Sequence, residues 1–226
     1  SGDELVPPGT ARQPGAIWES NGTLLETMLR ALGQSVTQRQ VVADQPDALR
    51  QALLDLAKDC DVVVSTGGIS AGDSDWIRPL VAELGAVDFW KLFLRPGRPF
   101  AFGSIGEGVP FFGLPGNPVA AAVTALQLLW PALQVLEGQS EPELFPRVMV
   151  ELADPLSRRP GRPELARARL DTDAAGTLLA RVDGSQASSR IGSLQHADLL
   201  LELPAEAGPL ESGTRLWAQL IRQRMF

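Results

Sequence analysis

The 226-residue sequence has one cysteine, Cys60, and one histidine, His196. A disulfide within the chain is therefore impossible, and a zinc site built from cysteine and histidine lacks ligands. A hydrolytic triad would need His196 as its base, and this residue lies in a late stretch of different composition. Cys60 directly precedes a run of valines and is interpreted as a small residue in or near the core. These scarcities argue against disulfide-rich, zinc-binding and triad-type proteins.

Lysine is also scarce, with only Lys58 and Lys91 against eighteen arginines, so cationic contacts fall mostly to guanidinium groups. The net charge of −7 provides no basic excess to neutralise phosphates, which argues against a nucleic-acid-binding protein. No uninterrupted apolar run approaches the ~20 residues needed to span a bilayer, and no signal peptide is visible. We therefore expect a cytoplasmic protein without membrane contacts. The chain starts within SGDEL and without methionine, so we interpret it as a piece of something longer.

The most informative stretch is DVVVSTGGISAGDSD, residues 61–75. Three consecutive valines predict a short strand buried on both faces, and the following Ser-Thr-Gly-Gly stops it. A buried strand that leads through a glycine loop into a helix is how open α/β sheets place anion sites, because backbone N–H groups face the crevice there. The alternative is a tight strand–helix connection that binds nothing.

Strands and helices are expected to alternate through residue 136. Strands are predicted at 35–42, 62–64, 87–94, 100–102 and 110–113, and helices at 21–32, 46–56, 76–84 and 119–136. This order predicts an α/β domain with a doubly wound, mostly parallel sheet, which we assign to residues 1–140. Beyond a linker at 138–146, short alternating stretches between turn residues predict a small all-β, barrel-like domain over residues 145–226.

Charged side chains are expected at one edge of the predicted sheet. Asp44, Asp73 and Asp75 follow predicted strands, as do the cations Lys91, Arg95 and Arg98. Carboxylates bind Mg²⁺, while guanidinium groups and loop amides bind phosphate, so the set suits a phosphorylated ligand held with a metal ion. Each member has a simpler explanation: Asp44 as a helix N-cap, the arginines as solvated turn residues, and LPGNP as the start of a helix.

Four motifs in this order resemble one known family: SGDEL, STGGISAGDSD, FWKLFLRPGRPFAFG and FGLPGNPV. They resemble the molybdopterin molybdenumtransferases of the MoeA type, whose eukaryotic relative is the gephyrin E domain. The resemblance implies a molybdopterin-binding α/β domain followed by the family's β-barrel-like domain. It also implies the reaction, which inserts molybdenum from molybdate into adenylylated molybdopterin with Mg²⁺ and releases AMP.

Carried over residue by residue, the resemblance assigns metal binding to Glu4, Asp44 and Asp75, and catalysis to Asp44, Asp75 and Lys91. Together with the two loops, it predicts a cofactor-binding set: Asn21, Thr66, Gly67, Gly68, Ser70, Gly72, Arg95, Arg98, Pro115, Gly116, Asn117, Pro118 and Ser193.

The chain departs from the family at several points. Arginine stands at positions 95 and 98, where lysine is common, and Gly192 stands where a serine usually precedes Ser193. Arginine keeps the charge but presents a rigid fork, so anion binding should survive the change. Two N-terminal domains and a strand before SGDEL are missing, so we expect a fragment that binds the pterin without turnover. The full-length protein is expected to be a homodimer that meets other proteins of the molybdenum cofactor pathway.

Two other functions remain open. One is a nucleotide- or pterin-binding domain like that of a molybdopterin adenylyltransferase. The PGRPFAFG turn and the extra β domain argue against this function. The other is a non-catalytic scaffold, as the gephyrin relative also serves in assembly, although no partner-binding segment stands out. Binding of adenylylated pterin, measured with and without Mg²⁺, would distinguish an enzyme from a scaffold.

Overall fold

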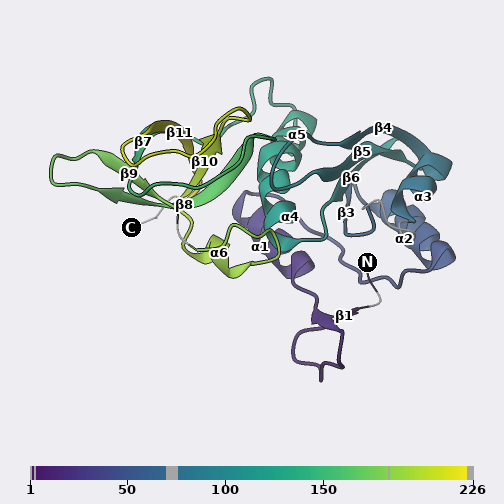
Figure 1. Ribbon diagram of the computed structural model, residues 1–226. Helices are drawn as coiled ribbons and strands as arrows, with labels where there is room; N and C mark the ends of the chain where they lie inside the picture. The colour runs from purple at the N-terminus through teal and green to yellow at the C-terminus, as the bar shows by residue number, and fades with distance from the viewer. Residues whose placement is uncertain (1, 3, 70–75, 183, 223–226) are drawn as a thin grey trace. The chain divides into compact units, whose positions relative to one another are not determined.

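The computed structural model describes residues 2, 4–69, 76–182 and 184–222 (Figure 1). The chain divides into two compact units. The first comprises Ser1–Leu92 and Gly97–Leu133, and the second comprises Phe93–Pro96 and Gln134–Phe226. The short segment Phe93–Pro96 therefore belongs to the second unit, although it connects two strands of the first.

The first unit is a four-stranded sheet with helices on both faces. The strands of this sheet are β3 (Val63–Thr66), β4 (Gly85–Lys91), β5 (Pro99–Ile105) and β6 (Val109–Leu114). Its helices are α1 (Asn21–Ala31), α2 (Pro46–Asp59), α3 (Ile77–Leu84) and α4 (Pro118–Thr124). Helix α4 continues through a π-helical segment, η1 (Ala125–Leu129), into α5 (Trp130–Leu136). Two short strands, β1 (Leu5–Val6) and β2 (Ile17–Trp18), pair in parallel with each other.

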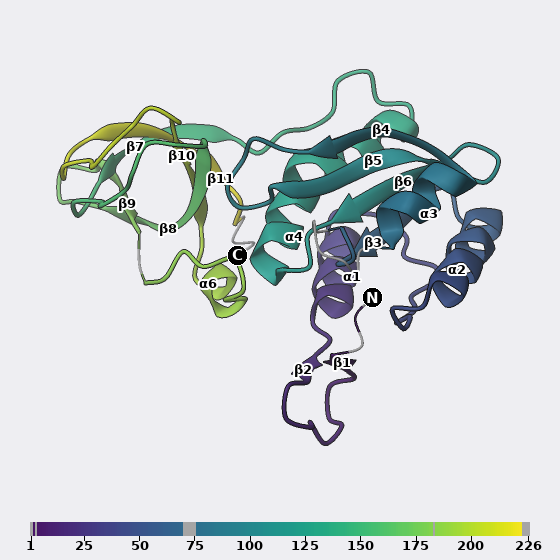
Figure 2. The same ribbon diagram turned by 45° about the vertical axis from the view of Figure 1, so that its right-hand side comes forward.

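The sheet order is β3-β6-β5-β4, which Figure 2 shows side by side. Strands β3 and β6 are parallel, whereas β6 with β5 and β5 with β4 are antiparallel. The α/β class is confirmed, but the sheet is mixed rather than mostly parallel. Short loops at residues 92–98 and 106–108 cause this, because a parallel pair needs a crossover of about a dozen residues or more. As a result, β3, β4 and β6 end at the same edge of the sheet, and β5 begins there.

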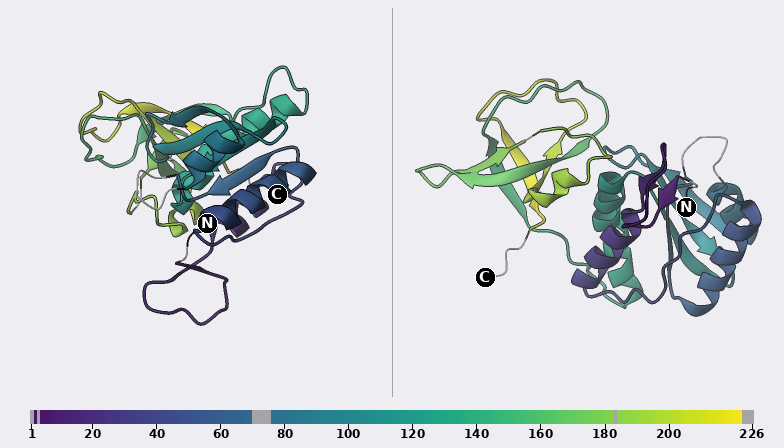
Figure 3. Two further views of the ribbon diagram at one scale, coloured as in Figure 1. Left: turned by 90° about the vertical axis from the view of Figure 1, so that its right-hand side faces the viewer. Right: turned by 90° about the horizontal axis from the view of Figure 1, so that it is seen from below.

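Each face of the sheet has its own hydrophobic core. Helices α2 and α3 cover one face, and α1 with the α4–η1 helix covers the other (Figure 3). Strand β6 serves both cores, since Phe111 packs on one side and Phe112 on the other. This explains why the central strand reads as a continuous apolar run instead of an alternating one. The fully buried side chains of this unit include Phe111, Ile77, Ile105, Leu114, Leu129, Val81, Val119 and Val123.

The prediction of a strand at residues 35–42 is wrong. These residues form no ladder with any strand in the described part of the chain, and β3 is an edge strand of the sheet there. Both residues 34–42 and residues 62–66 line a cavity of about 350 Å³, together with apolar side chains of α1 and α2. A strand exists only where a neighbour accepts and donates its backbone hydrogen bonds. The apolar residues of 35–42 line this cavity, and no strand of the described residues lies beside them to share backbone hydrogen bonds.

Helices α1 and α2 begin at the predicted residues, and the residues that precede them occupy the N-cap positions. Asn21 is the first residue of α1, with Ser20 at the N-cap position. Gln45, and not Asp44, is the N-cap residue of α2, with Pro46 at the first helical position. The prediction that Asp44 caps this helix is therefore wrong, because Pro46 sets the helix start and leaves Asp44 one residue too early.

Pro118–Leu136 is the one helix in the described ranges that is long and apolar enough to cross a membrane. Just over half of it, 56% of its most apolar window, is buried inside the protein. Such burial is what the core helix of an α/β sheet shows, because it packs directly on the strands.

The second unit is a closed five-stranded barrel, as the alternating pattern predicted. Its strands follow the order β10-β11-β7-β9-β8 around the barrel, with β7 and β9 parallel and the other pairs antiparallel. Leucines on β10 and alternate residues of β7 and β11 fill the interior, while Met149 and Trp217 point outward. The elements are β7 (Arg147–Leu152), β8 (Glu164–Thr172), β9 (Leu178–Arg181), the short helix α6 (Gly192–Gln195), β10 (Leu199–Leu203) and β11 (Arg215–Leu220).

Candidate functional site

Two loops meet at the edge of the sheet where β3 and β6 end. Thr66 pairs with Leu114, and the Gly67 N–H donates to the Leu114 carbonyl over 3.2 Å. A Cβ added to Gly116 would lie 3.4 Å from the Gly67 Cα, so the two loops are in backbone contact. Gly67 and Gly68 have φ of +77° and +63°, a region that glycine adopts without strain. The start of the predicted glycine loop and the LPGNP loop therefore lie side by side at this edge of the sheet.

Asn21 fastens this surface to α1. Its Nδ2 donates to the Gly116 carbonyl over 2.8 Å, and the residue is only 8% exposed. The Asn21 Oδ1 and the Ser65 Oγ are buried and have no hydrogen-bond partner among the described residues. Buried polar atoms are nearly always hydrogen-bonded in folded proteins. Their lack of a partner makes these positions of α1 and β3 exceptions to that rule.

The LPGNP loop leads directly into the long helix. Pro115 is buried, Asn117 is the N-cap residue of α4, and Pro118 occupies the first helical position. Proline fits there because its missing N–H would have no partner in the first turn. The N–H groups of that turn face the same edge as the glycine loop, which favours a negatively charged ligand.

Two cations flank this edge. Lys91 is the last residue of β4 and lies opposite Pro99, the first residue of β5, with its side chain exposed. Arg98 is also exposed, and its carbonyl accepts a hydrogen bond of 2.9 Å from the Leu92 N–H. Gly97 has φ of +110°, and a Cβ there would collide with the Thr124 methyl group of α4. Glycine thus lets the turn pack on α4 and keep both cations at the edge where the loops meet.

In the second unit, the barrel holds the segment that carries Arg95. The Arg95 N–H donates to the Pro163 carbonyl over 3.0 Å, and the Leu165 N–H donates to the Arg95 carbonyl over 2.8 Å. The Arg162 Nη1 also donates to the Leu94 carbonyl over 3.0 Å. At the side-chain level, Arg95 Nη1 lies 3.5 Å from Glu164 Oε2. The backbone position of Arg95 is therefore determined by β8.

Ser193, the other predicted site residue in this unit, is bound by a buried arginine. Arg167 is 3% exposed, and its Nε donates to the Ser193 Oγ over 3.0 Å. Burial lowers the pKa of the Arg167 guanidinium, and the negative charge of Glu164 works in the opposite direction. The Ser193 hydroxyl in turn donates to the Arg190 carbonyl over 2.7 Å. Arg167 thereby ties the Ser193 segment to β8.

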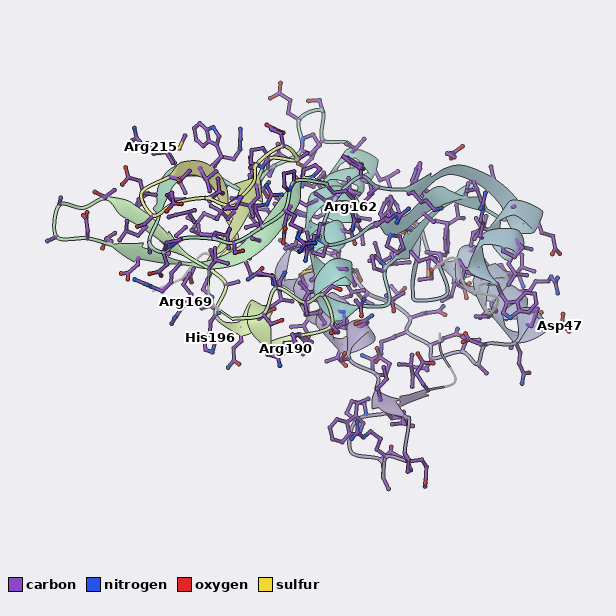
Figure 4. All side chains as sticks on the ribbon, in the orientation of Figure 1. Asp47, Arg162, Arg169, Arg190, His196 and Arg215 are labelled. Carbon is purple, nitrogen blue, oxygen red and sulfur yellow. The ribbon has the colours of Figure 1, made fainter. Side chains whose placement is uncertain are left out.

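A basic cavity of about 640 Å³ adjoins Arg167 and Ser193. Figure 4 shows Arg169, Arg190 and His196 along one side of the barrel unit near α6. Arginine forks and serine hydroxyls are donors that suit oxyanions such as phosphate. The polar residues that line this cavity are Arg167, Arg169, Arg181, Ser185, Ser189, Arg190, Ser193 and His196.

Comparison with known proteins agrees with this arrangement. Residues 1–135 match the family model described as the probable molybdopterin binding domain, and residues 149–220 match the MoeA C-terminal region (domain IV). The first match alone covers more than half of the 226 residues. The chain belongs to the MoeA-type molybdopterin-binding family.

Similar proteins carry names from this family. The chain is 30% identical to a molybdopterin molybdenumtransferase of Haemophilus influenzae over 94% of its own length and 52% of the relative's. It is 35% identical to the molybdenum cofactor synthesis protein cinnamon of Drosophila melanogaster, over 91% of the chain and 34% of that protein. A crystal structure of the molybdopterin biosynthesis moea protein from Pyrococcus horikosii superposes with a TM-score of 0.81 at 27% identity, over 98% of this chain and 53% of that one. The chain thus spans about half the length of these MoeA-type structures.

Only two of the three predicted metal ligands of the MoeA-type site, Glu4 and Asp44, lie within the described residues. Glu4 is exposed beside β1, and Asp44 is half-buried ahead of α2. Asp75 lies outside the described residues, as do Ser70 and Gly72 of the glycine loop. In the ranges that are described, no group of three or more His, Cys, Asp or Glu side chains is placed to hold a metal ion.

Two charged residues of the barrel were not singled out by the sequence analysis. Glu164 and Arg167 are buried although they are charged, at 7% and 3% exposure. They lie in ELARARL, a strand whose apolar positions predicted burial while its charges suggested a solvated face. A sequence signal that could have found them is the presence of both charge signs in a stretch that otherwise has the pattern of a core strand. Buried charges are usually paired with a charge of opposite sign.

Proposed function

We propose that this chain is the substrate-binding part of a molybdopterin molybdenumtransferase that acts in molybdenum cofactor biosynthesis. Its substrate is adenylylated molybdopterin, into which molybdenum from molybdate is inserted with release of AMP. The observation that supports this most is the contact between the glycine loop and the LPGNP loop, secured by the Asn21–Gly116 hydrogen bond of 2.8 Å. Membership of the MoeA-type family supports the same reaction.

In this proposal, the sheet edge of the first unit binds the phosphorylated part of the substrate. Backbone N–H groups of the glycine loop and of the LPGNP–α4 start hold the phosphate oxygens, and Lys91 and Arg98 neutralise their charge. The cofactor-binding roles predicted for Thr66, Ser70, Gly72 and Asn117 belong to the same proposal.

The barrel unit contributes a second group of donors. Arg95, Arg167 and Ser193 are proposed to bind an oxyanion, either a phosphate of the substrate or molybdate. Arg167 is already oriented by its 3.0 Å bond to Ser193, so little side-chain freedom is lost when an anion binds. The basic lining of the adjoining cavity supports this assignment.

Several finer features are proposed from the family resemblance. Mg²⁺ is expected on Glu4, Asp44 and Asp75, with catalytic roles for Asp44, Asp75 and Lys91. Mg²⁺ usually takes one or two protein carboxylates and completes its coordination with water and substrate phosphates. A homodimer of the full-length protein, a cytoplasmic location, pathway partners, and domain limits of 1–140 and 145–226 are proposed on the same basis.

The test measures binding of adenylylated molybdopterin to the 226-residue chain by isothermal titration calorimetry, with and without Mg²⁺. We expect binding that is tighter with Mg²⁺ and that weakens at least roughly tenfold in Lys91→Glu, because charge reversal places a repulsive carboxylate at the phosphate site.

Lys58→Glu is the matched control, since Lys58 is the only other lysine and lies on α2, paired with Asp55. It should bind as the unaltered chain does. If Lys91→Glu also binds with unchanged affinity, Lys91 does not contact the substrate. If the unaltered chain binds neither the adenylylated nor the free pterin, the proposed function is wrong for this chain.

A further inference from the structure

A buried carboxylate of the second unit is paired with an exposed arginine. The Glu164 side chain is 9% exposed, and its Oε2 is 3.5 Å from the Nη1 of Arg95. The negative charge of Glu164 also raises the pKa of the Arg167 guanidinium, whereas burial and the positive charge of Arg95 lower it. Arg95 is 57% exposed, so the carboxylate neutralises a cation that solvent and solutes can reach.

The carboxylate is not needed to hold this segment in place. Backbone hydrogen bonds join Arg95 to Pro163 and to Leu165, and the Arg162 side chain binds the Leu94 carbonyl. These bonds fix the turn whether or not residue 164 carries a charge. An ion pair with a partner as exposed as Arg95 contributes little stability by itself. What the buried charge of Glu164 does change is the electrostatic potential that an anion meets at Arg95 and Arg167.

Resting on the proposed function of this site, we propose that Glu164 is a built-in competing counter-ion of the barrel's oxyanion site. Glu164 pairs with Arg95 while the site is empty. When an anion binds, the Arg95 guanidinium pairs with the anion instead. Glu164 therefore lowers the affinity of the site for oxyanions and favours their release. The class of ligand is a tetrahedral dianion, free or as part of a larger substrate.

Removing the charge alone should then strengthen binding. Glu164→Gln keeps the shape of the side chain and a neutral oxygen beside Arg95, but it removes the competing negative charge. We expect the affinity for a dianion to rise roughly fivefold, which is the effect of one partly screened charge pair. The gain should shrink as ionic strength rises, because salt screens the removed repulsion.

The experiment is a titration of the 226-residue chain with molybdate and, separately, with sulfate at low ionic strength, repeated for Glu164→Gln. Glu151→Gln is the matched control: its carboxylate on the same barrel lies 3.6 Å from Arg215, yet it is remote from Arg95 in the barrel order. It should leave both affinities unchanged. A tighter site in Glu164→Gln, but not in Glu151→Gln, supports the proposal, since damage to the fold would weaken binding.

Unchanged or weaker binding by Glu164→Gln, with measurable binding by the unaltered chain, overturns the counter-ion role and leaves the proposed function standing. If the unaltered chain binds neither dianion, the oxyanion site of the barrel and the role of Glu164 both fail. Should Glu164→Gln not fold, Glu164→Asp gives the same test. It keeps the charge but withdraws it from Arg95, so tightening by a smaller factor is expected and weakening refutes the proposal.

Discussion

Asn21→Asp is the substitution that tests the contact between the two loops most directly. It keeps the size of the side chain but replaces the Nδ2 donor by a carboxylate oxygen. That oxygen would face the Gly116 carbonyl, which now accepts a hydrogen bond of 2.8 Å. The site is only 8% exposed, so water does not readily replace the lost donor.

We expect this substitution to lower the free energy of unfolding by about 3 kcal/mol at pH 7.5. The lost hydrogen bond accounts for about 1 kcal/mol, and a buried carboxylate without a cationic partner accounts for most of the rest. The position at the first turn of α1 offsets roughly 0.5 kcal/mol, because the helix N-terminus favours negative charge.

The loss should depend on pH. Burial beside a carbonyl oxygen raises the pKa of the introduced carboxyl group, so the folded state holds its proton more tightly than the unfolded state does. The penalty is therefore smallest at low pH, where the protonated group can donate to the Gly116 carbonyl, and it grows as pH rises above about 4.

Urea unfolding of the variant and the unaltered chain at pH 4.5 and pH 7.5 measures both effects. Asn117→Asp is the control, because Asn117 is exposed at the N-cap of α4, where aspartate is at least as favourable as asparagine. Equal stability of Asn21→Asp and the unaltered chain at pH 7.5, or a loss that does not change with pH, would refute the reasoning.

Three further predictions concern other parts of the chain. Gly97→Ala should lower the free energy of unfolding by about 2 kcal/mol, since φ is +110° and the new methyl group would collide with the Thr124 methyl group. Adding Thr124→Ser removes that methyl group, so the thermal unfolding midpoint of the double variant should lie between those of Gly97→Ala and the unaltered chain. Asp173 accepts backbone hydrogen bonds from Thr177 and Ala175, and these hold its pKa below the ordinary 3.8. The stability that this carboxylate contributes is present above about pH 4 and is lost as pH falls through the folded-state pKa, so thermal scans of Asp173→Asn and the unaltered chain should converge toward pH 3. Asp75→Asn in the full-length enzyme should abolish molybdenum insertion while pterin binding persists, and near-normal insertion would remove Asp75 from the metal site.

Local patterns in the sequence determined the class of each unit. The alternation of Val148, Val150 and Leu152 with less apolar neighbours, and short segments between turn residues, were enough to predict a β-barrel, because a strand with one buried face needs period two. The runs at 62–64 and 110–113 likewise predicted strands, the first of them as buried on both faces. Glycines at 67 and 68 and Pro118 marked the loops correctly, since their backbone requirements are local.

Tertiary structure alone decided which of these segments meet. The direction of β5 depends on two short loops, and the failure of residues 35–42 to form a strand depends on a missing neighbour. Asn21 and Gly116 are 95 residues apart, and no local pattern predicts that one binds the other. Glu164 and Arg167 look like surface charges in the sequence because burial of a charge depends on its partners. Those partners, Arg95 and Ser193, come from distant segments that only the folded barrel brings together.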